Sequence, residues 1–409
     1  MKKAPSITFK ISNGTGKMEK KFEFIEFLKK IFVKATPNGN RVGNQLWPIL
    51  SILKTGGYLP LFISDKKDHF ISHAVLSWQS LPTLAIGTFL IYWWSAIIYH
   101  FGVESSAEIL KPSQETPLTR INSVLQPIIQ VAEIVTGWLT CKQMAEFINN
   151  WQTFETQFNT VFKDVYKYKL NVRRFRDFLL IFYVILPALY FIQHQEYILS
   201  PELINGNKVF STLLTFSVVI FSFLVDVKTL LMYRVVQENF RETKNGIVAQ
   251  YKMTHAITKT PLGPEKVKQW IQLVNMIRNQ HKLSCQIQTP HQLTSIALSV
   301  IILTNNLHLF VNSLVNCSVN KAAVSYLPMG AFAVVFFRLV FKCIMAEKVS
   351  DEEQSIAQEL IQMESSGANI FIKMEYTAVE VYVRPDREQA NRYFLCELNN
   401  IEQSIFTPG

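Results

Sequence analysis

Residues 74–99 read AVLSWQSLPTLAIGTFLIYWWSAIIY and contain no Asp, Glu, Lys or Arg. A bilayer core is roughly 30 Å thick and is crossed by about 20 apolar helical residues, so this stretch is long enough to span a membrane. Its far end holds Tyr92, Trp93, Trp94 and Tyr99, an aromatic cluster typical of a membrane–water interface. The stretch therefore predicts a transmembrane helix.

Five further apolar windows follow it. They are 121–141, which carries the single acid Glu133, then 178–192, 209–225, 292–311 and 322–337. We expect the fourth helix to continue past Asp226 to Tyr233 and the sixth to reach Met345. A soluble protein seldom needs six such windows. The sequence therefore predicts an all-α, polytopic bundle of six transmembrane helices.

The composition agrees with a membrane protein. Of 409 residues, 49% are hydrophobic and 18% are charged, and the mean hydropathy is +0.14. These values exclude a disordered chain and disfavour a soluble enzyme. Five dispersed cysteines exclude a disulfide scaffold and a zinc ribbon. No common hydrolase, metalloprotease or P-loop motif occurs. We therefore expect no enzyme activity, no catalytic or metal-ligating residues and no cofactor.

The basic residues predict the orientation. Thirty-six Lys and Arg lie before the first window, in alternate connections and after the sixth window, against four in the remaining connections. Because cytoplasmic segments carry the basic excess, the N-terminus is expected to be cytoplasmic. The net charge of +10 then needs no nucleic-acid partner. Residues 1–18 are polar, so the first span is expected to act as the signal anchor.

The predicted organisation has three parts. Residues 1–73 form a cytoplasmic N-terminal region with an apolar segment before the first span, 74–345 form the six-helix domain, and 346–409 form a cytoplasmic tail. This predicts a multi-pass protein of the plasma membrane. An N-x-S/T sequence at Asn316 lies close to the fifth window, and it could be either glycosylated or unused.

Three stretches resemble the arthropod gustatory receptors. They are residues 49–61, ILSILKTGGYLPL, followed by Trp78-Gln79-Ser80; the exit of the sixth window, 337–353; and residues 391–398, NRYFLCEL. The first is similar to the sugar-receptor branch of that family. The resemblance implies a ligand-gated cation channel subunit that senses a small tastant, with a sugar as the candidate. It also implies a homo- or hetero-tetramer with related receptor subunits.

Two other classes of membrane protein fit the sequence less well. The expected cytoplasmic N-terminus argues against a G-protein-coupled receptor. A secondary transporter of a small polar solute is the alternative, although no paired internal repeat is visible. In the family that the chain resembles, a seventh helix with a Thr-Tyr-hydrophobic-Gln-Phe signature lines the pore. No such window or signature occurs in 346–409, so the chain is expected to conduct no current alone.

The resemblance places a ligand pocket in the outer half of the helices. The polar residues that the predicted topology puts there are Gln126, Gln130, Tyr190, Thr215, Asn305, Asn306, His308 and Tyr326. Gln126 and Gln130 are four residues apart and share one helix face. Neutral donors and acceptors of this kind suit a sugar. The alternative is that these side chains only form hydrogen bonds between helices.

Charged residues form two further groups. Glu133 and Asp226 fall in the inward half of the bundle, where either a pair with Lys228 or Arg338 or a place on a cation path is open to them. Residues 346–366 alternate acids with Ile356, Leu360 and Met363 at helical spacing. Those acids are expected either to face solvent or to meet basic loops of a neighbouring chain.

Overall fold

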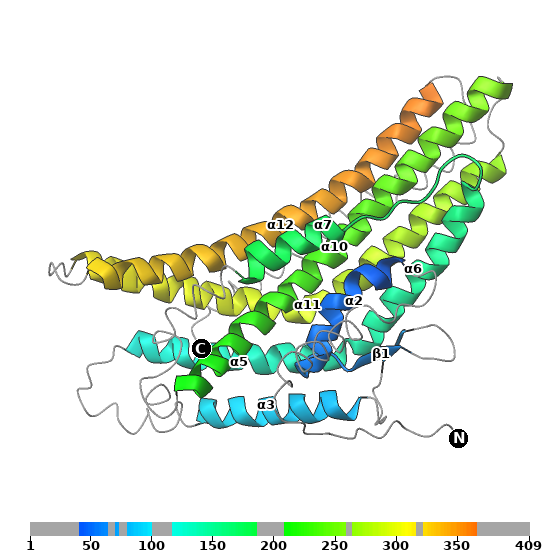
Figure 1. The fold of residues 1–409 in the computed structure, drawn as a ribbon. Coiled ribbons are helices and arrows are strands. Elements are labelled where there is room, and N and C mark those ends of the chain that lie inside the picture. The colour runs from blue at the N-terminus through cyan, green and yellow to red at the C-terminus, as the bar shows by residue number, and fades with distance from the viewer. Residues whose placement is uncertain are drawn as a thin grey trace, which may run out of the picture. The chain divides into compact units, whose positions relative to one another are not determined.

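The computed structural model describes residues 41–63, 70–72, 80–99, 117–185, 208–258, 264–315 and 322–365. These residues are almost entirely helical, so the all-α class predicted from the sequence is confirmed (Figure 1). The described part also contains one short antiparallel pair, β1 (Leu61–Ile63) and β2 (Phe70–Ser72), in which Leu61 lies opposite Ser72.

The described helices include each of the six apolar windows in part, together with segments outside them. They are α2 (Arg41–Thr55), α3 (Leu81–Tyr99), α5 (Pro117–Leu139), α6 (Cys141–Val161), α7 (Arg173–Phe178), the π-helix η2 (Leu179–Ile185), α10 (Lys208–Thr258), α11 (Pro264–Val315) and α12 (Ala322–Ser365). Among the described residues, Leu81–Tyr99 is the one helix long and apolar enough to cross a membrane by length and composition, and Pro127–Leu139 is a shorter apolar helix.

Three helices are far longer than a membrane span. Helix α10 has 51 residues, α11 has 52 and α12 has 44. The basic segment between the fourth and fifth predicted spans, 234–285, is helical at 234–258 and 264–285. The reason is an amphipathic repeat: Val267, Trp270, Val274 and Ile277 are buried at helical spacing within a charged sequence. Because charged side chains occupy the other faces of these helices, the stretch contains too many charges to count as an apolar window.

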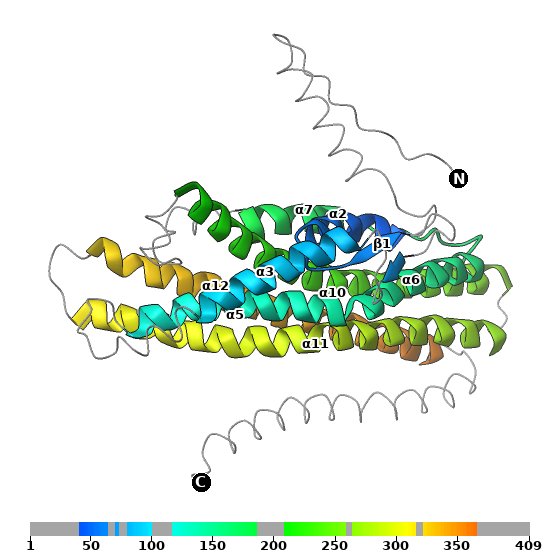
Figure 2. The ribbon, with the colours of Figure 1, turned by 90° about the horizontal axis from the view of Figure 1, so that it is seen from below.

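The chain divides into two compact units. Unit 1 comprises Met1–Glu155, Leu170–Val236 and Asn279–Glu347, and unit 2 comprises Thr156–Lys169, Gln237–Arg278 and Lys348–Gly409. Within unit 1, helix α3 packs along α5 (Figure 2). Only small parts of α3 are buried, at Thr83, Gly87 and Trp94, so most of its apolar side chains are exposed or half-buried.

The segment after α2 packs closely on α5 in unit 1. Gly57 has φ +85°, a left-handed conformation that glycine adopts without strain, and it ends the helix. Its carbonyl oxygen accepts a hydrogen bond of 2.8 Å from Nε1 of Trp138. A Cβ on Gly137 would lie 2.3 Å from the carbonyl oxygen of Tyr58, so only glycine fits there. This packing fixes the position of the Tyr58 side chain.

Unit 2 has an aromatic core and a set of ion pairs. The rings of Phe158 and Phe162 lie 4.7 Å apart, and Phe158 also contacts Tyr168 at 5.1 Å. Arg241 Nε is 3.2 Å from Glu352 Oε1, and Lys244 Nζ is 3.6 Å from Glu352 Oε2.

A further pair in this unit joins Arg278 Nε to Glu353 Oε1 at 2.7 Å. The acids of α12 thus meet the basic residues of α10 and α11 in the same chain. The expected helical spacing is confirmed as well, since Ile356, Leu360 and Met363 are all buried on α12.

Candidate functional site

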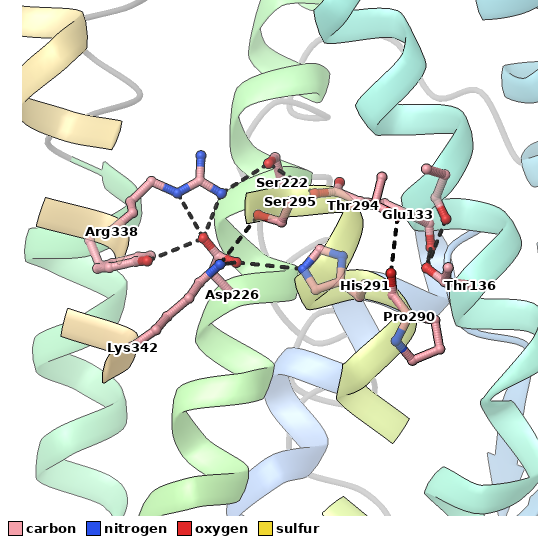
Figure 3. A network of polar contacts seen from close by, with 12 residues as sticks. Glu133, Thr136, Ser222, Asp226, Pro290, His291, Thr294, Ser295, Arg338 and Lys342 are labelled. Atoms are coloured by element: carbon pink, nitrogen blue, oxygen red, sulfur yellow. Dashed lines mark hydrogen bonds and ion pairs between the residues drawn. The ribbon is translucent and has the colours of Figure 1, made fainter. Parts of the chain in front are cut away.

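The centre of the candidate site is Asp226 on α10, whose side chain is fully buried. Arg338 on α12 donates to its Oδ2 from Nε at 2.7 Å and lies 2.5 Å from it through Nη2. Lys342 Nζ lies 2.5 Å from Oδ1 (Figure 3). Of the alternatives that the sequence left open for Asp226, the pair with Arg338 is the one observed, and Lys342 is a second partner.

Helix geometry explains why both cations meet one carboxylate. Arg338 and Lys342 are four residues apart on α12, so their side chains lie on the same face of the helix. The guanidinium of Arg338 also lies over the ring of Phe223, 4.4 Å from its centroid, which is a favourable cation–π geometry. Phe223 lies on α10 three residues before Asp226, so α10 presents both partners to α12.

Two more elements reach Asp226. The hydroxyl of Tyr183 in η2 donates to Oδ2 at 3.1 Å, and Nε2 of His291 on α11 lies 3.6 Å from Oδ1. Lys342 Nζ also donates to Ser295 Oγ on α11 at 3.5 Å. Four helical elements therefore converge on one buried carboxylate.

The network continues through Ser222 to Glu133 on α5. Arg338 Nη2 donates to Ser222 Oγ at 3.1 Å, and Ser222 Oγ donates to Glu133 Oε1 at 3.0 Å. Gln130 Nε2 lies 3.5 Å from Glu133 Oε2, at the limit of a hydrogen bond, and its Oε1 accepts from the hydroxyl of Tyr58. A continuous polar path thus joins the segment after α2 to α5, α10 and α12.

Burying these charges raises the free energy of the folded state unless every contact in the network is kept. Removing charges from water is unfavourable, and a buried ion pair offsets that cost only with close geometry and further hydrogen bonds. Asp226 has both: two cations within 2.5 Å and a hydroxyl donor at 3.1 Å. A network of this kind fixes how helices pack, and it changes packing when one member gains or loses charge.

A narrow pocket adjoins the network in unit 1. Its empty volume is about 310 Å³, including space continuous with solvent. Glu133, His291, Tyr58 and Lys228 line it together with apolar side chains and two threonines. Lys228 is only 7% exposed. It makes no hydrogen bond and no ion pair within the part of the chain that the structure describes, so the pairing considered for it with Glu133 or Asp226 does not form.

The large exposed apolar side chains have a distinctive distribution. Apart from Met253, every one identified among the described residues falls in or next to a window predicted to span the membrane. They are Ile86, Phe89, Tyr92, Tyr99, Val135, Leu139, Phe178, Ile181, Phe182, Ile185, Leu293, Ile296, Val300, Ile301, Leu307, Val311, Phe336, Phe337 and Ile344. Exposed apolar area on this scale needs a partner other than water.

The candidate ligand residues lie in several places. Gln130 is buried within the network, Asn305 is buried on α11, and His308 is exposed on the same helix. Four others lie in helices where the structure does not describe their side chains: Gln126 in α5, Thr215 in α10, Asn306 in α11 and Tyr326 in α12. Tyr190 lies outside the described residues. Among the described side chains of the set, Gln130 is the member that joins the network.

Several residues of the network did not emerge from the sequence: Tyr58, Tyr183, Ser222, His291, Ser295 and Lys342. The spacing of Arg338 and Lys342 at the exit of the sixth window was a usable signal for one of them.

The site offers charge and hydrogen bonding but no evident metal chemistry. Among the described residues, no three His, Cys, Asp or Glu side chains are grouped as metal ligands would be. Compared with known proteins, the chain matches no family model and no curated protein sequence.

Proposed function

We propose that this protein is a polytopic membrane protein of the plasma membrane with six spans and a cytoplasmic N-terminus. The observation that carries this proposal is the distribution of exposed large apolar side chains among the described residues: apart from Met253, they lie in or next to five of the six predicted spans, and the charged half of α11 has none of them. Lipid is the partner that satisfies such surfaces. The segregation of Lys and Arg supports the orientation.

Within that membrane setting, we infer a chemoreceptor function: a gustatory-receptor-like subunit of a ligand-gated cation channel that senses a small tastant, with a sugar as the candidate. The stretch 49–61, which resembles the sugar-receptor branch, contains Tyr58, and Tyr58 donates a hydrogen bond to Gln130, a candidate ligand residue. A ligand that competes for the Gln130 amide would change the polar path that ends at Asp226. This route links ligand binding to the packing of α5, α10 and α12.

The test is co-expression with a related gustatory receptor subunit in cultured cells, followed by calcium imaging and patch-clamp recording with a panel of sugars and other small tastants. A tastant-evoked cation current that exceeds the current of the partner subunit alone is the expected result. The matched control carries Gln130→Leu in this chain and must reach the cell surface. Equal responses with and without this chain, at proven surface expression, would reject the receptor function.

A secondary transporter remains the second candidate because of one observation, the buried cluster of Asp226, Arg338 and Lys342. Ionisable groups inside a membrane protein commonly mark ion or proton pathways. Reconstitution into liposomes separates the two functions. A transporter would show saturable solute uptake driven by an ion gradient and solute counterflow without one, whereas a channel subunit would show a conductance and no counterflow.

A further inference from the structure

We propose that the pocket at Lys228 binds a small monovalent anion of the halide class. The first observation is the state of Lys228 itself. Its side chain lies in the interior of unit 1, lines the pocket and has no hydrogen-bond or ion-pair partner among the described residues. An ammonium in a protein interior without a close partner is unfavourable, and an anion bound beside it in the pocket would offset part of that cost.

The second observation is the local charge balance. The cluster around the pocket holds three cationic side chains, the buried Lys228 and Lys342 and the partly buried Arg338, against two buried carboxylates, Asp226 and Glu133. Asp226 is fully engaged by Arg338 and Lys342. Glu133 accepts from Ser222 and lies within reach of Gln130. One positive charge is left over, and it is the one that faces the pocket.

The third observation concerns size and neighbours. The pocket is narrow, and its other polar lining includes Thr136 and Thr140, whose hydroxyls donate to backbone carbonyls one helical turn earlier at 2.7 Å. Few donors are therefore free for a large polar ligand. A monovalent ion that interacts mainly through charge with Lys228 suits this space better than a sugar or an amino acid, which would need several directional hydrogen bonds.

Glu133 is the feature that opposes an anion, because it lines the same pocket. Its charge should weaken binding without abolishing it, since a cation and a carboxylate act on the anion with opposite signs. This gives the proposal a directional test. Removing the negative charge at Glu133 should strengthen anion binding, while removing the positive charge at Lys228 should weaken it.

The experiment measures binding of radiolabelled chloride to the purified full chain in detergent, with unlabelled bromide or gluconate as competitor. Saturable binding that bromide displaces and gluconate does not is expected. Lys228→Met should lower the affinity at least about tenfold, the change that the loss of one charge-assisted contact produces. Lys142→Met, at an exposed lysine of α6, is the matched control and should leave binding unchanged.

Glu133→Gln provides an independent arm in case Lys228→Met lowers the yield of folded protein. It keeps an amide oxygen for Ser222 and should bind chloride several-fold more tightly than the wild type. Chloride binding that is equally strong in Lys228→Met, or that weakens in Glu133→Gln, would overturn the proposal. So would an absence of saturable binding in the wild type. The assay needs no tastant and no current, so its outcome is separate from that of the receptor function.

Discussion

Arg338 and Asp226 are 112 residues apart in the sequence, yet Nη2 of Arg338 lies 2.5 Å from Oδ2 of Asp226. This ion pair connects α10 with α12, and Lys342 reinforces it from the next turn of α12. The three side chains form the most tightly packed set of charges in the described part of unit 1. The stability of the fold therefore depends on their remaining together.

Asp226→Asn should destabilise the protein strongly, because it leaves Arg338 and Lys342 buried with no counter-charge. Breaking a buried ion pair in this way costs about 3–5 kcal/mol. Thermal unfolding in detergent, together with surface expression, measures the loss. Asp177→Asn is the matched control: Asp177 is half exposed on α7 and pairs with Arg176 at 2.8 Å, so its loss should cost less than about 1 kcal/mol. Similar costs for the two variants would contradict the central role of Asp226.

Orientation can be tested with short epitope tags. A tag inserted at 259–263, between α10 and α11, should be unreachable by antibody in intact cells and reachable after permeabilisation, because the basic residues around it predict a cytoplasmic side. A tag at 105–110, between α3 and α5, should stain intact cells. If the first tag stained intact cells and the second did not, the orientation would be the opposite of the one proposed.

The stability of unit 1 should depend on pH through Glu155. Burial raises the pKa of this carboxyl from 4.5 to about 7, and the N–H of Arg41, which donates to Oε1 at 3.1 Å, limits the rise. Between those two values the folded state holds a proton that the unfolded state has released. The free energy of unfolding therefore falls as the pH rises through this window, by about 3 kcal/mol in all.

Glu155→Gln keeps an oxygen acceptor for Arg41 and removes the titration. Its melting temperature should fall less than that of the wild type between pH 4.5 and pH 8. The exposed Glu146 on α6 supplies the control, since Glu146→Gln should keep the wild-type slope. Burial also raises the pKa of Glu242, so a residual slope in the same direction is expected in every variant. Identical slopes for Glu155→Gln and wild type would disprove the assignment.

Helices α10 and α12 should make their contacts within one chain. Lys244 Nζ donates to Ser355 Oγ at 2.9 Å, so a short bismaleimide should link Lys244→Cys to Ser355→Cys inside a single polypeptide. The link is detected as a faster-migrating monomer after electrophoresis. Co-expressed chains that each carry one of the two cysteines should give little cross-linked dimer. A dominant dimer in that mixture would show that these residues meet between subunits instead.

Ligand contact and helix packing can be separated at Gln130. Tyr58→Phe removes the hydroxyl that donates to Gln130 Oε1 and leaves the amide in place. If the amide binds the tastant, Gln130→Ala should raise the half-maximal concentration about tenfold, whereas Tyr58→Phe should preserve or strengthen the response. Calcium imaging with surface labelling measures both. Equal losses in the two variants, in step with reduced surface expression, would assign Gln130 to packing.

The sequence predicted the apolar parts of the fold better than the charged parts. Uncharged stretches such as Leu81–Tyr99 can be recognised as helices from their length and composition. The charged halves of α10 and α11 were not predicted to be helices, because a search for apolar windows misses amphipathic repeats. That repeat is visible in the sequence as the helical spacing of the buried residues Val267, Trp270, Val274 and Ile277.

The site was predictable only in part. Asp226 and Arg338 were recognisable because charged residues are rare in apolar surroundings. Tyr58, Tyr183 and His291 were not, since their roles arise from contacts across more than 40 residues of sequence, which a single sequence does not encode as a pattern. Lys228 was visible as a charge, but its lack of a partner is a property of the packed structure.

The packing of α2 has a consequence for the order in which the chain assembles. Gln45 on α2 bonds to the backbone of Leu170 and Val172, and its own carbonyl accepts from Arg176 Nη1, 131 residues later. At about 5–20 residues per second, translation needs roughly 7–26 s to supply that partner. During this interval α2 has already left the ribosome, and the part of its surface that meets residues 170–176 still lacks its partner. Its nascent surface is thus a natural client for chaperones or for the membrane interface until the later helices arrive.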